Sequence, residues 1–281
     1  LRKLGGITLR TNLDPLEQIW ENRPSLPANP VEIQPLEYAG ETLASKVVRI
    51  RKSLRELHAD GMLVSALDDI AWTLNLRGTD VHCNPVFVSY LLIESDKVSL
   101  FVDDNKLSPE VKQYLQDNQV SLYNYNKVEK CLESYSEYNI LLDGDETSYY
   151  LWKTVKCQEI VAAASPIPAM KAVKNEAEIE GYRSAMLKDG VAMVKFLKWL
   201  KPAVEAGGQT EISIDEKLTS LRAEQKLFRD ISFDTIAGYK EHGAIVHYEA
   251  TPETDVTLKA EGFLLLDSGA QYLDGTTDIT R

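Results

Sequence analysis

The sequence predicts an α/β fold class for its first part and an α+β fold class for its second. Helical and strand-like segments alternate from about residue 41 to about residue 163, which is typical of an α/β domain with a mixed sheet. Two prolines in the segment 165–168 then favour an extended crossing between domains. After that crossing, two helix patterns lead into short segments with the period of two that strands show, which indicates an α+β unit.

Length and composition limit the function classes. The 281 residues suit one large domain or two ordinary ones, and 43 acidic against 31 basic side chains give a formal net charge of −12. An acidic chain disfavours nucleic acid and anionic membranes as main partners. The sequence has no run of 18 apolar residues and no signal-peptide pattern, and its three cysteines form no CxxC pair. These features predict a cytoplasmic protein with reduced thiols.

Residues 1–38 are expected to be the end of an upstream domain and its linker. They contain one short helix pattern at 13–20, and then four prolines punctuate an extended connector. The chain begins with Leu1 and stops at Arg281, directly after a strand pattern. We therefore expect a fragment of a longer protein.

The α/β part follows in order. Pro109 is expected in the first turn of the helix at 108–118, where no backbone hydrogen bond is lost because the N–H groups of a first turn have no partner within the helix. The expected elements are helix 43–58, strand 61–66, helix 68–75, strands 86–93 and 98–102 as a hairpin, helix 108–118, strand 120–125, helix 127–135, strand 140–143, helix 145–152 and strand 160–163.

The second part begins with a long amphipathic helix over 175–200, ended by Pro202 and the glycines 207–208. Its apolar face is expected to consist of Ile179, Tyr182, Met186, Met193, Phe196 and Leu197. A second helix should run to about residue 225, with Ser213 and Glu216 as a capping box. Strands are then expected at 233–237, 244–247, 263–266 and 277–279.

Two aspartates stand out near the end of the chain. Four apolar residues lead into Asp267, an Asp-Gly turn signal follows at 274–275, and a second short strand pattern surrounds Asp278. Strands that fold back at this turn would place the two carboxylates nearly opposite each other, with Cβ atoms roughly 5 Å apart. Two divalent cations are one natural counter-charge for such a pair. The competing interpretation is that these aspartates cap the turn or face solvent.

The four histidines are the candidate partners of this pair. His247 is expected on a strand that enters the sheet of Asp267, although a lone histidine on an apolar strand more often has a structural role. His58 ends a helix, His82 lies beside Cys83 in a polar loop, and His242 lies at a loop tip. Since the sequence has no nucleophile elbow, Walker A loop or His-Glu-x-x-His motif, the remaining constellation is Asp267, Asp278 and His247.

These residues belong to stretches that resemble a known family. The segment from Asp267-Ser268-Gly269-Ala270-Gln271-Tyr272 to Asp278-Ile279-Thr280-Arg281 is similar to the first metal-ligand segment of the pita-bread metallopeptidases. It most resembles the cytosolic Xaa-Pro aminopeptidases, also called aminopeptidase P. Further similar stretches are Ser65–Trp72, Asn75–Asp80, Asn84–Phe87, Lys171–Asn175 and Gly243–Tyr248, so the resemblance spans nearly the whole chain.

The resemblance implies a domain organisation and an activity. Residues 1–38 would close an upstream domain, 39–168 would form a creatinase N-terminal-like central domain, and 169–281 would be the first half of a pita-bread catalytic domain. The family removes the N-terminal residue from peptides with proline in second position, usually with two Mn²⁺ ions, and tends to form homodimers. Asp267 matches the ligand of one metal ion and Asp278 the ligand that bridges both, whereas His247 matches a histidine that hydrogen-bonds substrate.

The resemblance also predicts that the 281-residue chain is inactive on its own. The family's other three metal ligands, one histidine and two glutamates, would follow Arg281. Two alternatives remain open at this point. One is a prolidase- or creatinase-like hydrolase with the same fold and another substrate, and the other is a non-catalytic binding protein on that fold.

Overall fold

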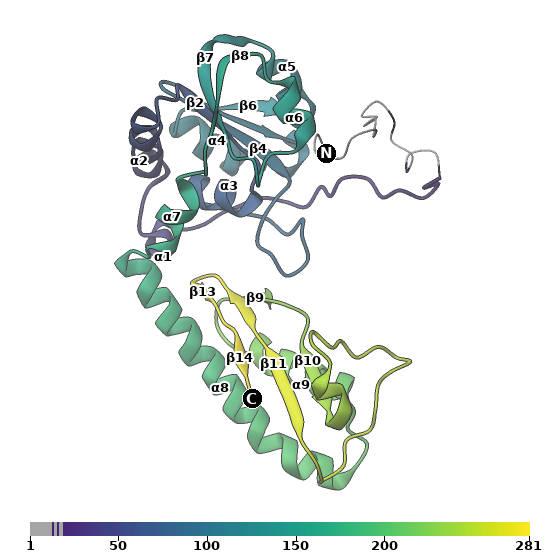
Figure 1. The fold of residues 1–281 in the computed structure, drawn as a ribbon. Helices are drawn as coiled ribbons and strands as arrows, with labels where there is room; N and C mark the ends of the chain where they lie inside the picture. The colour runs from purple at the N-terminus through teal and green to yellow at the C-terminus, as the bar shows by residue number, and fades with distance from the viewer. Residues whose placement is uncertain (1–12, 14–15, 17–18) are drawn as a thin grey trace.

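The computed structural model describes residues 13, 16 and 19–281. The helix pattern at 13–20 therefore falls largely outside the described residues. The chain forms two lobes, an α/β lobe and a second lobe in which two small sheets lie against a long helix (Figure 1).

The first lobe contains a mixed six-stranded sheet, as the alternating pattern predicts. Its strand order is β6-β5-β4-β2-β7-β8, with parallel pairing for β2–β7, β7–β8 and β5–β6, and antiparallel pairing for β2–β4 and β4–β5. The strands are β2 Gly61–Val64, β4 Ser89–Glu94, β5 Val98–Val102, β6 Val120–Asn124, β7 Tyr135–Leu142 and β8 Cys157–Ala162. The helices are α2 Leu43–Glu56, α3 Leu67–Leu74, α4 Pro109–Asp117, α5 Val128–Leu132 and α6 Tyr149–Thr154.

Short elements complete this lobe and lead to the second one. The two-residue strands β1 Glu32–Ile33 and β3 Leu76–Arg77 pair with each other. The remaining elements are α1 Leu36–Ala39, the 3₁₀ turns η1 Asp104–Lys106 and η2 Tyr125–Lys127, and α7 Ile167–Ala172. Buried apolar side chains from the sheet and its helices form two large clusters, so the lobe has a core of its own.

Helix α8, Glu176–Ala206, is the backbone of the second lobe (Figure 1). Asn175 caps it, and Glu178 completes the capping box. The helix does not end at Pro202 as predicted, but continues to the C-cap Gly207. Pro202 leaves only the carbonyl of the exposed Lys198 without its helical partner, and water can satisfy that group.

The buried face of α8 also differs from the predicted one. Only Met193 and Phe196 of the six predicted face residues are buried, and the other four are 40–44% exposed. Small residues lie against the sheets instead, including Gly181 and Ala185. A methyl group on Gly181 would lie 2.1 Å from the Asp274 carbonyl oxygen, so the strands approach this helix too closely for large side chains.

The rest of the second lobe packs on α8. Helix α9, Glu211–Ala223, is capped by Thr210 and Ser213 rather than by the predicted Ser213 and Glu216. The sheets have the orders β10-β11-β14 and β13-β12-β9. The strands are β9 Phe228–Ile231, β10 Ile236–Tyr239, β11 Leu264–Ser268, β12 Ala270–Tyr272, β13 Gly275–Thr276 and β14 Ile279–Thr280.

The predicted strand at 244–247 is wrong. The 3₁₀ helix η3, Lys240–Ala244, and an exposed turn occupy this region. His247 has φ +54°, a value that is not compatible with a strand.

Candidate metal centre

Asp267 and Asp278 lie on the two arms of one hairpin. Asp267 on β11 pairs with Thr280 on β14, and the same register continues to the pair Tyr272–Gly275. The two-residue connection is therefore Leu273–Asp274, one residue earlier than the predicted Asp-Gly turn. Because Asp267 pairs with Thr280, Asp278 lies diagonally across from Asp267 rather than directly opposite.

Both aspartates belong to the same face of the hairpin. Leu266, Ser268 and Ile279 are buried, whereas Asp267 is half-buried and Asp278 is exposed. Because side chains alternate along a strand, the carboxylates point away from the core beneath α8 and α9. Diagonal neighbours on one face have Cα atoms about 7–8 Å apart, which leaves room for cations between two carboxylates.

The Thr280 side chain orients one of these carboxylates. Its hydroxyl donates a hydrogen bond to Asp267 Oδ1 at 2.6 Å. Carboxylate oxygens are the ligands that Mn²⁺ and Mg²⁺ prefer. Within the described residues, however, no third histidine, cysteine, aspartate or glutamate completes a cluster with this pair. The donor set fits part of a dinuclear centre.

A buried ion pair between α8 and α9 contacts the hairpin. Arg222 on α9 donates to both carboxylate oxygens of Asp189 on α8, from Nε at 2.7 Å and from Nη2 at 3.0 Å, and both side chains are fully buried. The hydroxyls of Tyr272 and Thr277 also donate to Asp189, at 3.2 and 3.0 Å. Burial, with Asp189 beside it, raises the pKa of Tyr272 above its usual range. The two helices and the hairpin thus share one polar network.

The structure does not place His247 on the sheet. It lies in the exposed turn after η3 with a left-handed backbone conformation. The next residue, Tyr248, is buried and anchors this turn.

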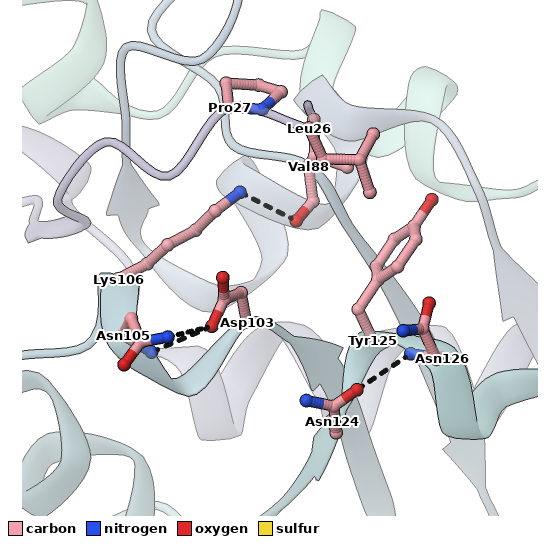
Figure 2. Close-up of a pocket in the computed structure, with 9 residues that line it drawn as sticks. All are labelled: Leu26, Pro27, Val88, Asp103, Asn105, Lys106, Asn124, Tyr125 and Asn126. Carbon is pink, nitrogen blue, oxygen red and sulfur yellow. Dashed lines mark hydrogen bonds between the residues drawn. The ribbon is translucent and has the colours of Figure 1, made fainter. Parts of the chain in front are cut away.

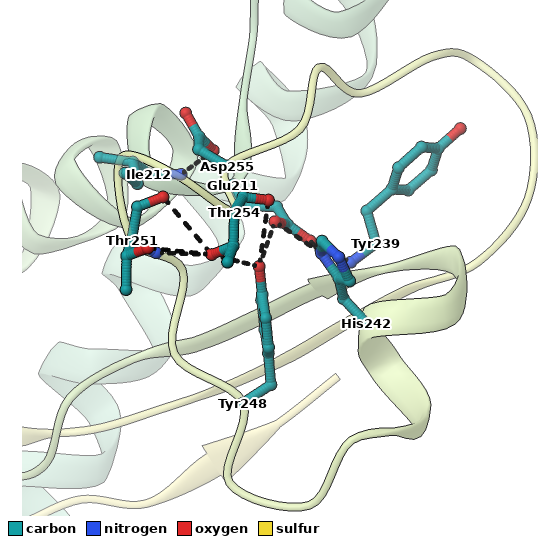
Figure 3. A network of polar contacts seen from close by, with 8 residues as sticks. All are labelled: Glu211, Ile212, Tyr239, His242, Tyr248, Thr251, Thr254 and Asp255. Atoms are coloured by element: carbon teal, nitrogen blue, oxygen red, sulfur yellow. Dashed lines mark hydrogen bonds and ion pairs between the residues drawn. The ribbon is translucent and has the colours of Figure 1, made fainter.

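That anchor belongs to a network that the sequence interpretation missed (Figure 3). Glu211 is fully buried and accepts hydrogen bonds from the Tyr239 N–H at 2.7 Å, from His242 Nδ1 at 2.9 Å and from the Tyr248 hydroxyl at 2.9 Å. His242, which the sequence suggested was a solvated tip, is therefore half-buried and paired. One sequence signal could have revealed that Glu211 is buried. Glu211 lies three residues before Ile214 and seven before Leu218, and this spacing places it on the apolar face of α9.

Two cavities offer room for a ligand. The larger, about 740 Å³, lies between the lobes and is lined by residues of both, including Trp72, Arg77, Cys83, Tyr182, Asp230 and Gln271. The cavity reaches the hairpin turn, since Leu273 and Asp274 line it, and there the Gln34 side chain donates to the Leu273 carbonyl oxygen at 2.7 Å.

The smaller cavity, about 300 Å³, lies near η1 in the first lobe (Figure 2). Its lysine, Lys106, is buried and paired with Asp80 at 2.6 Å. Its aspartate, Asp103, accepts hydrogen bonds from Asn105 at 3.0 Å. Because these charges already serve local structure, we assign this cavity no ligand.

Comparisons with known proteins cover nearly the whole chain. The Creatinase/Prolidase N-terminal domain family matches residues 22–178, and Metallopeptidase family M24 matches residues 180–281. Xaa-Pro aminopeptidase 1 of Dictyostelium discoideum is 39% identical over 93% of this chain and 42% of its own length. Xaa-Pro aminopeptidase ApepP of Drosophila melanogaster is 37% identical over 95% of this chain and 44% of its own length.

A solved structure shows the same fold. The X-prolyl aminopeptidase of Caenorhabditis elegans, described as a cytosolic enzyme with a di-nuclear active site, superposes with a TM-score of 0.88 and 32% identity. The match covers 95% of this chain and 45% of that one, so the chain spans less than half the length of these relatives. The chain belongs to the family in which a creatinase/prolidase N-terminal domain precedes an M24 metallopeptidase domain of the pita-bread fold.

Proposed function

We propose that the protein containing this chain is a metal-dependent Xaa-Pro aminopeptidase, which hydrolyses the N-terminal residue from peptides with proline in second position. The observation that carries the proposal is the pair of carboxylates on one exposed hairpin face, in a chain whose Xaa-Pro aminopeptidase relatives match along at least 93% of its length. We propose Asp267 and Asp278 as ligands of two divalent cations, with Mn²⁺ as the expected metal.

The bound cations would acidify a water molecule and polarise the scissile carbonyl group. The chain's own residues prepare this site. Thr280 donates to one oxygen of Asp267, which leaves the other oxygen free to bind a cation. Glu211 holds both sides of the segment that includes His247, because it accepts from His242 and Tyr248. We propose that His247 donates a hydrogen bond to the substrate near the scissile bond.

Further parts of the proposal concern organisation. We propose that residues 1–38 are the end of an upstream domain and its linker, and that residues 39–168 and 169–281 are separate domains. We also propose that the protein acts on proline-containing peptides as a cytoplasmic homodimer. The cytosolic description of the C. elegans relative supports the location. No described helix has the length and apolar character needed to cross a membrane.

The test uses the full-length protein and two tripeptides that differ only in proline or alanine at the second position. We expect Mn²⁺-dependent cleavage of the proline peptide alone, abolished by a chelator and restored by metal. Asp278→Asn should lower kcat/KM by at least about 100-fold, since a metal ligand is lost. Asp145→Asn, the same change at an exposed position of the first lobe, is the matched control.

Three results would contradict the proposal. They are equal cleavage of both tripeptides, full activity of the Asp278→Asn protein, and, with an Xaa-Pro dipeptide as a third substrate, cleavage of the dipeptide but of neither tripeptide. The last result would instead favour the prolidase-like alternative.

A further inference from the structure

A loop of the first lobe reaches the second lobe beside the hairpin. Residues 80–85, which follow β3, descend from the first lobe toward β9 (Figure 1). The Gln271 side chain donates to the Cys83 carbonyl oxygen at 3.0 Å, and His82 Nε2 lies 2.8 Å from Asp234 Oδ1. Asp234 lies between β9 and β10, and the two contacts join residues that are 152 and 188 positions apart in the sequence.

Three different donor groups meet at this contact. One nitrogen of His82, the sulfur of Cys83 and one carboxylate oxygen of Asp234 all lie within 4.8 Å of one another. Three ligands of a tetrahedral zinc ion are about 3.3–3.8 Å apart, given bond lengths of roughly 2.0–2.3 Å. To bind zinc, the Cys83 sulfur would move slightly closer to the other two ligand atoms, and the distance between His82 Nε2 and Asp234 Oδ1 would lengthen slightly from 2.8 Å.

The backbone holds the cysteine in this position. Cys83 has φ +61°, a conformation that a residue with a Cβ rarely adopts without support. The tight turn is closed by the Asn84 N–H, which donates to the Val81 carbonyl oxygen at 3.1 Å, and by the Asn84 side chain, which donates to the His82 carbonyl oxygen at 3.0 Å. The turn thus presents two consecutive ligand side chains toward Asp234.

The charge around the group favours a cation. The carboxylates of Asp234 and Asp230 place negative charge beside the Cys83 thiol. The Asp234 carboxylate accepts the hydrogen bond from His82 Nε2, and Asp230 and Glu249 add negative charge nearby. The same negative field would attract a divalent ion, which displaces the thiol proton into solvent.

The geometry points to a zinc-binding site formed by His82, Cys83 and Asp234 at the boundary of the two lobes. A set of one nitrogen, one sulfur and one oxygen suits Zn²⁺ and disfavours Ca²⁺ and Mg²⁺, which take oxygen ligands. The His82 and Asp234 side chains are 68% and 50% exposed, so a water molecule can reach the fourth position. The ion would tie the first-lobe loop to the start of β10, the strand that pairs with Asp267.

Cobalt substitution tests this site independently of the proposed peptidase activity. Co²⁺ bound to a thiolate gives a sulfur-to-metal charge-transfer band in the near ultraviolet, whereas the carboxylates of Asp267 and Asp278 cannot give one. The background protein is therefore the full-length Asp267→Asn/Asp278→Asn variant, kept reduced. We expect one equivalent of Co²⁺ to produce the band and Zn²⁺ to remove it by competition.

Variants assign the ligands. The band should disappear in Cys83→Ser and persist in the matched Cys131→Ser and Cys157→Ser proteins. His82→Gln and Asp234→Asn, at exposed positions that do not threaten folding, should each weaken Co²⁺ binding at least about tenfold. Absence of the band, its persistence in Cys83→Ser, or unchanged affinity in both exposed variants would overturn the assignment.

Discussion

Replacement of Asp189 by asparagine should destabilise the second lobe strongly. This substitution leaves the Arg222 guanidinium buried without a counter-charge and offers one acceptor oxygen in place of two. Breaking a buried ion pair by removing one partner costs about 3–5 kcal/mol. The hydroxyls of Tyr272 and Thr277 would then compete for the remaining acceptor, which places the expected loss at the upper end of this range.

Urea unfolding followed by circular dichroism measures this loss, and hydrogen exchange of residues 264–281 assigns it to the hairpin. The matched control is Lys195→Met, which removes the exposed ion pair between Lys195 on α8 and Glu224, the C-cap of α9, and should leave the midpoint unchanged. Adding Arg222→Met to the asparagine variant should restore about 2–3 kcal/mol, since the orphaned charge is removed. The reasoning fails if Asp189→Asn shifts the midpoint no more than Lys195→Met, or if the second substitution restores nothing.

Three other predictions concern separate contacts. Gly181→Ala should lower the melting temperature, because its methyl group would clash with the Asp274 carbonyl oxygen. Gly190→Ala on the same helix meets no atom within 4 Å and should raise the free energy of unfolding by about 0.5–1 kcal/mol. Equal shifts in melting temperature for the two variants would contradict this reasoning. Burial lowers the pKa of Lys46 to about 8. Between pH 8 and about 10.5 the unfolded chain therefore binds more protons than the folded chain. The free energy of unfolding, compared with that of Lys46→Met, should rise with pH across this window by up to about 1.4 kcal/mol per pH unit. A flat difference in urea midpoints across this window would refute the assignment. Glu211→Gln should accelerate hydrogen exchange in residues 240–254 and cost about 1–3 kcal/mol, since glutamine cannot accept from all three partners; unchanged exchange there would show that the network does not hold this segment.

Local signals in the sequence predict most of the first lobe. The predicted position of Pro109 in the first turn of α4 is confirmed, with Ser108 as its cap, and the apolar runs became the strands of a mixed sheet. These features depend on neighbouring residues, so periodicity and capping chemistry are sufficient. The buried face of α8 depends instead on how closely the hairpin approaches, and this favours Gly181 over larger residues such as Met186. A hydrophobic periodicity cannot report that distance.

The candidate site shows the same limit. The strand signals indicate that Asp267 and Asp278 are on neighbouring strands, and the shared face follows from alternation. The strand assigned to His247 was wrong because four apolar or small residues, 243–246, suggested β structure where the chain turns. The burial of Glu211 depends on partners 28–37 residues away, which no local pattern reveals.

The turn register shows how a tertiary contact overrides a strong local signal. Asp-Gly is a favoured hairpin dipeptide because glycine tolerates positive φ, but Gly275 does not adopt positive φ here. A methyl group on Gly275 would lie 3.1 Å from the Ala185 side chain and 3.3 Å from the Gly181 carbonyl oxygen, so this glycine permits close packing against α8. Lys188 holds the neighbouring Asp274 through both carboxylate oxygens, at 2.6 and 2.7 Å. Helix α8 therefore selects the turn one residue early. A turn at 274–275 would leave Asp278 four residues from the position paired with Asp267, whereas the observed turn leaves it two residues away, in the diagonal position.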